Sequence, residues 1–180
     1  MAHESTIFEI MEALVIADKH VIGDIMAHKE LWTKGVSAVN NSYKALNCLV
    51  ECGKLVKGDS YFKLPHCKSN YEQHARLLTR ALAEILKTNP NCRIFREHTI
   101  AEKGLRPDAL VLLKKENQGM CLVLEVCHNE TENYFEQKMN TWRYWSGAAA
   151  YLSQLTGYRV PHFDIVRSNE LTDYLKEVLQ

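Results

Sequence analysis

The stretch that decides the fold is Arg106-Pro-Asp-Ala-Leu-Val-Leu-Leu113, a polar segment, and then Cys121-Leu-Val-Leu-Glu-Val-Cys127. Both apolar runs have the length of a β-strand. The segment 114–119 between them, Lys-Lys-Glu-Asn-Gln-Gly, is rich in turn-forming residues. The pattern therefore predicts two antiparallel strands of one buried sheet, joined as a hairpin.

The register of this hairpin sets the relation between two carboxylates. If the turn is centred near Asn117, the numbers of facing residues sum to about 233 or 234. Asp108 then lies opposite either Glu125 or Val126. The first register puts both carboxylates on one face of the sheet, and the second puts them on opposite faces. Paired carboxylates repel unless a cation joins them, so the first register predicts a metal site of Asp108 and Glu125.

Pro107-Asp108, followed after a strand and a turn by Glu125-x-Cys127, resembles the PD-(D/E)xK nuclease superfamily. The resemblance implies that Asp108 and Glu125 hold Mg²⁺ and that a lysine two residues after the glutamate steers the attacking water. Cys127 stands at that lysine's position, and a thiol supplies no positive charge in either protonation state. Lys138 is the candidate for a relocated lysine, so the expected catalytic residues are Asp108, Glu125 and Lys138.

Two alternatives remain open at this site. Glu97 or Glu84 would add a third carboxylate to a metal site. Without a metal, Asp108 merely begins a strand, and Glu125 pairs with a nearby arginine such as Arg106 or Arg96.

Composition limits the class of protein. The chain has 180 residues, 46% of them apolar, and a formal net charge of zero. It can hold one ordinary domain or two small ones, and any nucleic-acid surface must be local. No signal-peptide pattern begins the sequence, and no apolar run reaches the roughly 18 residues that span a bilayer. We expect a cytoplasmic protein without membrane contact, whose six cysteines are reduced thiols.

The first part of the chain predicts helices followed by a hairpin. Apolar residues recur at helical spacing in 5–17, in 21–32 and in 37–52. Ser5 is the expected N-cap of the first helix, and Gly53 is the expected left-handed residue that ends the third.

Two short alternating runs, 54–57 and 60–64, follow at once. Gly58-Asp59 between them predicts a two-residue turn with the glycine at positive φ. Three helices followed by a hairpin is the order of a winged helix, and the passage from Leu49 to Val56 resembles the helix-to-wing junction of many bacterial regulators.

In a winged helix, the third helix lies in the major groove and the wing follows the DNA backbone. Amide and lysine side chains fill the polar face of helix 37–52, whereas Tyr43 is expected in the core. No acidic residue occurs between Glu30 and Glu51. These features favour DNA over the open alternative, a winged helix that binds protein. The expected base contacts are Ser37, Asn40, Asn41 and Lys44, and the expected phosphate contacts are Lys34, Lys57 and Lys63.

The rest of the chain predicts a helix, three strands, a helix, a strand and a helix. The expected ranges are helix 71–86, strand 92–97, the two hairpin strands, helix 131–145 with an extension to 152, strand 162–166 and helix 170–179. This is the core order of the PD-(D/E)xK fold. The expected fold class is therefore α+β, with an N-terminal winged helix-turn-helix over 1–65 and an α/β restriction-endonuclease-like domain over 66–180.

The winged helix, the Arg106-Pro-Asp-Ala phrase, and Leu124-Glu-Val followed by Lys138 and Arg143-Tyr144 together resemble the plasmid replication-relaxation proteins. The resemblance implies a DNA-binding protein of a mobile genetic element, that is, a plasmid, phage or integrative element. Its winged helix would read double-stranded DNA, and a degenerate nuclease-like domain would serve assembly or further DNA contact.

Two other functions remain open. One is a Mg²⁺-dependent DNA endonuclease targeted by the winged helix, and Mg²⁺ is expected only if that nuclease site is active. The other is a protein-interaction module that binds no nucleic acid. A homodimer is expected because winged helices usually read paired half-sites.

Overall fold

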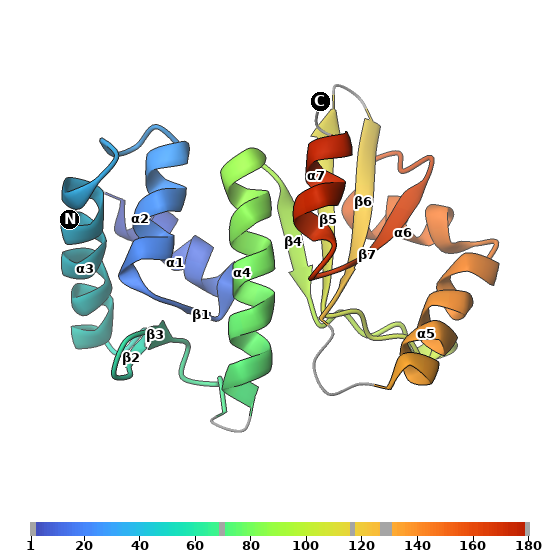
Figure 1. Ribbon diagram of the computed structural model, residues 1–180, viewed down its shortest axis with the longest axis horizontal. Coiled ribbons are helices and arrows are strands. Elements are labelled where there is room, and N and C mark those ends of the chain that lie inside the picture. Colours follow the sequence, from blue (N-terminus) through green and yellow to red (C-terminus); the bar gives the residue numbers. More distant parts are fainter. Residues whose placement is uncertain (1–2, 69–70, 116–117, 127–130, 179–180) are drawn as a thin grey trace. The chain divides into compact units, whose positions relative to one another are not determined.

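The computed structural model describes residues 3–68, 71–115, 118–126 and 131–178. The protein is α+β, and it divides into two compact units, Met1–Pro90 and Asn91–Gln180. Each unit contains its own sheet, one of three strands and one of four (Figure 1). Among the described residues, no helix combines the length and the apolar character needed to cross a membrane.

The boundary between the units lies later than the predicted boundary after Pro65. Helix α4 (Glu72–Thr88) was expected to open the second domain, but it contacts α1, α2 and β1 of the first unit. The buried hydroxyl of Thr79 lies 2.9 Å from the Leu14 carbonyl oxygen and 2.6 Å from that of Ile16, and donates to them. A buried hydroxyl needs such acceptors, so these bonds fix α4 to the first unit.

In the part of the first unit that the structure describes, three α-helices precede α4: α1 (Glu4–Leu14), α2 (Lys19–His28) and α3 (Val36–Glu51). Ser5 lies inside α1 rather than at its N-cap, so that prediction was wrong. Asp18 caps α2 by accepting the His20 and Val21 amides at 2.7 and 3.0 Å.

The predicted left-handed end of α3 is confirmed. Gly53 has a φ of 71°. The amides of Gly53 and Lys54 donate to the Val50 and Leu49 carbonyls, both at 2.9 Å. This is the double hydrogen bond that closes a helix on a left-handed glycine.

The small sheet has the order β1-β3-β2, with antiparallel neighbours: β1 (Ile16–Ala17), β2 (Val56–Lys57) and β3 (Phe62–Lys63). Strand β1 was not predicted, because its two residues fall at the end of a run with helical spacing. The hairpin is confirmed, but its turn is centred on Asp59 and Ser60, since the Gly58 amide donates to the Tyr61 carbonyl at 2.9 Å. Gly58 does not have positive φ. A side chain there is excluded by Tyr61, whose ring would lie 2.5 Å from a Cβ.

The second unit holds a sheet of order β4-β5-β6-β7. Its strands are β4 (Arg93–Arg96), β5 (Ala109–Lys115), β6 (Gln118–Glu125) and β7 (Phe163–Arg167). Strands β4 and β6 run antiparallel to β5, and β7 runs parallel to β6. Ala109 faces Leu124. Continuing this register by one residue places Asp108 opposite Glu125, which confirms the first of the two predicted registers.

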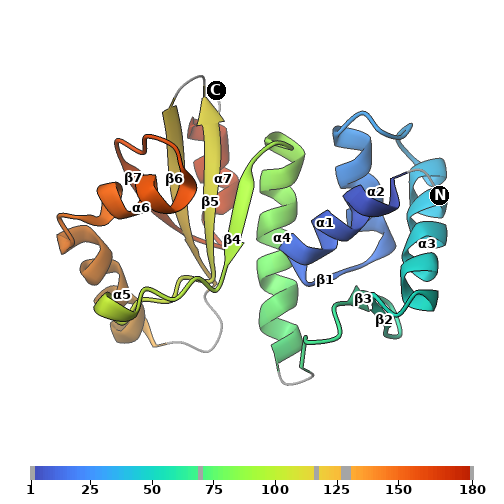
Figure 2. The same cartoon turned by 180° about the vertical axis from the view of Figure 1, so that it is seen from behind.

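Helices α5 (Glu132–Tyr144), α6 (Ala148–Thr156) and α7 (Leu171–Val178) cover this sheet, and a short 3-10 helix, η2 (Ala101–Lys103), precedes β5. The predicted long helix is interrupted at Trp145, whose backbone is extended. Figures 1 and 2 show α7 on one face of the sheet and α6 on the other.

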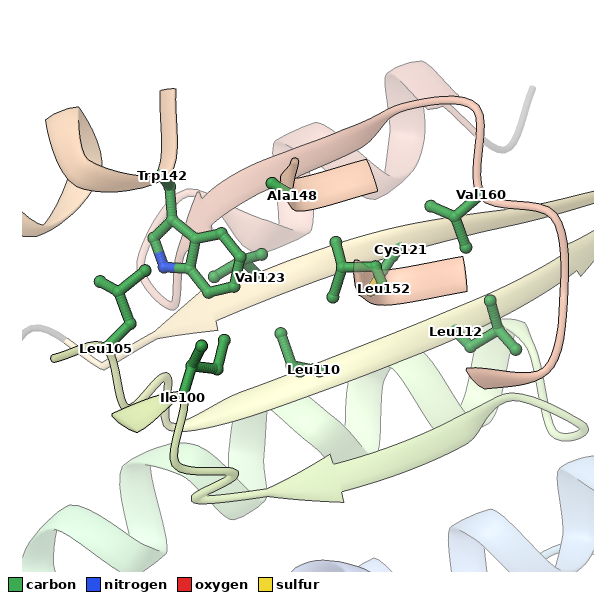
Figure 3. Close-up of a cluster of buried hydrophobic side chains, with 10 residues drawn as sticks. All are labelled: Ile100, Leu105, Leu110, Leu112, Cys121, Val123, Trp142, Ala148, Leu152 and Val160. Atoms are coloured by element: carbon green, nitrogen blue, oxygen red, sulfur yellow. The ribbon is translucent and has the colours of Figure 1, made fainter. Parts of the chain in front are cut away.

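The core of the second unit lies between the sheet and helices α5 and α6 (Figure 3). Trp142 is fully buried there. Burial raises the pKa of the Cys121 thiol to about 12, so this cysteine is a packing residue rather than a thiolate ligand. The ten buried residues of the cluster are Ile100, Leu105, Leu110, Leu112, Cys121, Val123, Trp142, Ala148, Leu152 and Val160.

Candidate functional site

Helix α3 buries one face and exposes the other. Ser37, Asn40 and Lys44 lie on the exposed face, together with the exposed Lys34 in the loop that precedes the helix. Asn41 lies at the border of that face and is half-buried. The structure therefore brings the expected base-contacting residues onto one helix surface, because they recur every three or four residues. The buried face consists of Ala38, Ser42, Ala45, Leu46 and Leu49.

Tyr43 belongs to the exposed face and not to the core, so the prediction of its burial was wrong. Its side chain is 41% exposed. The Tyr43 hydroxyl accepts a hydrogen bond from Lys57 Nζ at 3.0 Å, and the same ammonium donates to Asn47 Oδ1 at 3.1 Å. The Lys57 and Lys19 ammonium groups lie 4.9 and 5.3 Å from the centre of the Tyr43 ring. Hydrogen bonding from Lys57 lowers the pKa of the Tyr43 phenol.

Sequence reasoning missed Lys19, Tyr43 and Asn47 as members of this surface. The available signal was the spacing of Asn40, Tyr43 and Asn47, which follows the exposed stripe of α3. Lys19 carried no such signal, since it reaches Tyr43 from another helix.

Lys63 is engaged inside the first unit, although it was expected to contact phosphate. Its ammonium lies 2.5 Å from Glu72 Oε1 on α4, and Tyr61 donates to Glu72 Oε2 at 2.7 Å. Hydrogen bonding within this pair raises the pKa of Lys63 and lowers that of Glu72. The charge of Lys63 is therefore neutralised by the protein itself, unlike that of Lys57.

In the second unit, Asp108 and Glu125 lie on the face of the sheet covered by α5 and α6. Side chains alternate along a strand. Leu110 and Leu112 of β5, and Cys121 and Val123 of β6, belong to the core beneath these helices. Asp108 lies two residues before Leu110, and Glu125 lies two residues after Val123, so their side chains belong to the same face of the sheet.

The Lys138 ammonium lies 2.5 Å from Glu125 Oε2. Glu125 is 1% exposed, and the Lys138 side chain is 11% exposed, so the pair is buried. Asp108 Oδ2 accepts the Val126 amide at 2.7 Å. The structure thus places Lys138 in direct contact with Glu125, and it holds Asp108 on the backbone of the neighbouring Val126. Glu97, expected as a further ligand, pairs with Arg106. Cys127, the position of the motif lysine, lies outside the described residues.

Arg167 ties α5 to the sheet beside this site. It is the register partner of Glu125 on β7. Its guanidinium lies 2.6 Å from Glu132 and 3.5 Å from Glu136, both on α5, and it stacks on Phe135 at 4.0 Å. These contacts fix the turns of α5 that precede Lys138.

The donor set of Asp108 and Glu125 fits Mg²⁺. Magnesium prefers oxygen ligands, keeps several waters and needs only one or two protein carboxylates. Within the described ranges, no group of three or more histidine, cysteine, aspartate or glutamate residues is placed to hold a metal. Glu84, the other expected ligand, lies in the first unit and pairs with Lys87 at 2.5 Å.

No protein-family model matches the sequence, and no curated protein matches it. Among solved structures, the chain is similar to the crystal structure of protein VC1899 from Vibrio cholerae, with a TM-score of 0.29 and 11% sequence identity. The alignment covers 98% of this chain and 52% of that chain, so this chain spans about half the length of that protein. A similarity at this level says nothing about activity, so function is inferred from the two sites above.

Proposed function

We propose that the protein binds double-stranded DNA through α3 and the β2-β3 hairpin. The observation that carries the proposal is the exposed face of α3, where Ser37, Asn40 and Lys44 lie together. The arrangement around it supports a winged helix: three helices are followed by a hairpin, and β1 pairs with β3 of that hairpin. In such a module the third helix enters the major groove.

The residues divide into two roles. Asn40 and Asn41 carry amides that can pair bidentately with adenine, and Ser37 and Lys44 reach neighbouring base edges. Lys34 and Lys57 contact phosphates, which fixes the position of the helix without reading sequence. Lys63 contributes less to DNA binding than these two lysines, because Glu72 already neutralises it.

The test is duplex binding by fluorescence anisotropy, using a randomised pool and then selected sequences. The Asn40→Ala/Lys44→Ala double variant should abolish binding. A matched control is Lys68→Ala/Gln73→Ala, which removes one lysine and one amide from exposed positions of the same unit, outside α3 and the hairpin. Intact binding by the Asn40/Lys44 variant would overturn the proposal.

The cellular role is proposed from the sequence resemblance. The protein acts as a DNA-binding component of a plasmid, phage or integrative element, and the second unit serves assembly or further DNA contact. The order β4, β5, β6, α5, α6, β7, α7 in the second unit supports a nuclease-like domain, since it follows the expected order of elements after the first helix, which belongs to the first unit. Binding to paired half-sites would require a homodimer, and sedimentation with and without duplex tests this expectation.

A second function is favoured by the Lys138 ammonium, which lies 2.5 Å from Glu125. We infer from it a Mg²⁺-dependent endonuclease in which Asp108 and Glu125 would hold the metal. The ion would supply charge to polarise a phosphoryl oxygen and to acidify a bound water. Lys138 holds a positive charge at the Glu125 carboxylate. Arg167 positions α5, the helix that carries Lys138, through ion pairs with Glu132 and Glu136.

Nicking of supercoiled plasmid with Mg²⁺ or Mn²⁺ separates the two functions. The informative variant is Asp108→Asn, because the amide oxygen still accepts the Val126 amide while the carboxylate charge is lost. The exposed Asp173→Asn is the control. Metal-dependent nicking that Asp108→Asn loses establishes the enzyme. Duplex binding without nicking leaves the second unit as a binding or assembly domain.

A further inference from the structure

A cavity of about 500 Å³ opens in the first unit between the start of α2, the middle of α3 and the hairpin. Its size falls within the roughly 300–1,000 Å³ typical of ligand-binding pockets. Polar and aromatic side chains line it together, among them Lys19, His20, Tyr43, Lys57, Ser60 and Tyr61. The cavity lies beside the exposed face of α3, because Tyr43 belongs to both.

Two lysine ammonium groups lie beside one tyrosine ring in this cavity, which two carboxylates also line. Lys19 and Lys57 both lie against the Tyr43 ring, at 5.3 and 4.9 Å from its centre. Neither forms an ion pair with any residue that the structure describes, and the hydrogen bonds of Lys57 go to the neutral oxygens of Tyr43 and Asn47. Like charges held close together favour a bound anion, which lowers their mutual repulsion.

The amides at the start of α2 do not supply this site. Asp18 accepts the His20 and Val21 amides and so occupies the donors that a helix start would otherwise offer to an anion. An anion in the cavity is therefore bound by side chains. Two acidic residues, Asp18 and Asp59, also line the cavity. Asp59 is exposed on the hairpin turn, where its charge opposes an anion.

We propose that this cavity is a subsite for the DNA backbone, in which Lys19 and Lys57 contact one phosphodiester and Tyr43 positions both lysines. The inference rests on the proposed DNA-binding function and extends it. The volume exceeds what a single phosphate fills, and it accommodates the phosphate with its flanking sugars. The Tyr43 ring and hydroxyl hold the two ammonium groups in place before DNA arrives, which reduces the entropy lost on binding.

The first experiment measures duplex affinity against salt concentration. Each lysine that contacts phosphate contributes about one unit to the slope of log K against log salt. Lys19→Gln/Lys57→Gln should therefore lower the slope by about two units. Lys29→Gln/Lys68→Gln, which removes two lysines away from the cavity, should leave the slope within about half a unit of the wild-type slope. Thermal unfolding of each variant verifies that it is folded.

The second experiment removes the charge of the Asp59 carboxylate, which opposes an anion in the cavity. Asp59→Asn removes a carboxylate from the cavity and adds no donor of comparable strength, so duplex affinity at low salt should rise severalfold. Asp24→Asn, also exposed in the first unit but outside the cavity, should have no effect. A merely structural role for Lys19 and Lys57 does not predict this gain.

A third measurement tests whether the cavity binds an anion in the absence of DNA. Inorganic phosphate added to ¹⁵N-labelled protein should shift the amide signals of His20, Tyr43 and Gly58, and Lys19→Gln/Lys57→Gln should abolish these shifts. An unchanged salt slope in Lys19→Gln/Lys57→Gln overturns the subsite, and the DNA-binding proposal then survives if Asn40→Ala/Lys44→Ala still abolishes binding. Absence of duplex binding by the wild-type protein overturns both proposals, even if inorganic phosphate binds in the cavity.

Discussion

Lysine has opposite roles in two regions of the molecule. The α3 surface comprises the exposed face of α3 together with Lys19 and Lys57, and the Glu125 site comprises Asp108, Glu125 and Lys138. Lys57 donates to two neutral oxygens at the protein surface, and Lys19 shares the Tyr43 ring with it. Lys138 lies buried against the Glu125 carboxylate. The first surface thus keeps its positive charge for an outside partner, whereas the second balances its charge internally.

This difference affects which ligand each region attracts. A surface that keeps its positive charge attracts a polyanion over a long range, and the affinity for that polyanion falls as the salt concentration rises. A buried, internally paired carboxylate attracts nothing at long range, and a metal that enters must compete with Lys138 for Glu125. We therefore expect large effects of substitution on stability at the Glu125 site and on the salt dependence of binding at the α3 surface.

The largest expected effect is on stability. Lys138→Met removes the ammonium that lies 2.5 Å from a carboxylate that is 1% exposed. Breaking a buried pair by removing one partner costs about 3–5 kcal/mol, because it leaves a buried charge less compensated. Urea unfolding, followed by tryptophan fluorescence to which the buried Trp142 of the same unit contributes, measures the loss.

Two further variants control this result. Lys176→Met breaks an exposed pair with Asp173 and should cost less than about 1 kcal/mol. Lys138→Met/Glu125→Leu removes both charges and should recover most of the lost stability. If Lys138→Met is no more destabilising than Lys176→Met, the charges at the Glu125 site are not paired as described.

A smaller effect is expected at the pair of Lys63 and Glu72, through pH. The pKa of Glu72 is lowered, so its stabilising contribution is present above its ordinary pKa of 4.5 and is lost as the pH falls through the lowered value. The pKa of Lys63 is raised, so its contribution is complete below 10.5 and is lost as the pH rises through the raised value. The pair therefore stabilises the first unit fully between these limits.

Between pH 7 and pH 3, the wild-type protein should lose more stability than Glu72→Gln, which has no carboxylate to titrate at that position. Urea midpoints of both proteins at the two pH values give the comparison. Equal losses would show that Lys63 is not held by Glu72, and Lys63 would return to the group of expected phosphate contacts.

The same pair predicts a difference between two lysines of the hairpin. Lys57→Gln should lower the salt slope of duplex binding by about one unit, whereas Lys63→Gln should change it by well under half a unit. The reason is that Glu72 neutralises Lys63, and no acid neutralises Lys57 among the described residues. Anisotropy titrations at several salt concentrations measure both slopes, and equal changes would show that Glu72 does not keep Lys63 from DNA.

Local patterns predicted the hairpin of the second unit and its register. Two apolar runs and a turn of fixed length leave few ways to pair, and one of the two predicted registers is observed. Lys138 was predicted as a residue that reaches the Glu125 site because it lies on the next helix. A lysine side chain is long enough to span from that helix to the strand.

Long-range contacts could not be predicted in the same way. Helix α4 has apolar residues on more than one side, and its sequence does not indicate in which unit they are buried. Tyr43 lies three residues after the exposed Asn40 and three before the buried Leu46, so its spacing fits either face of α3. Lysines from α2 and the hairpin contact its ring at the surface. Lys63 resembles any other basic residue of a hairpin until Glu72 of α4 is brought beside it. In each case the deciding partner is distant in sequence.

The smallest expected effect is on the ionisation of Tyr43, and it tests whether Lys57 and Lys19 act on the same ring. The pKa of Tyr43 is lowered from 10.0 chiefly by the hydrogen bond from Lys57, whereas Lys19 acts only through its charge. Lys57→Gln should therefore raise the pKa of Tyr43 towards 10.0, and Lys19→Gln should raise it less. Titration of ¹³C-labelled tyrosine by NMR resolves the phenol, with Lys68→Gln as the control. Equal shifts in the two variants would mean that Lys57 acts on Tyr43 through charge alone, and Tyr43 would then hold neither lysine in a fixed position for a phosphate.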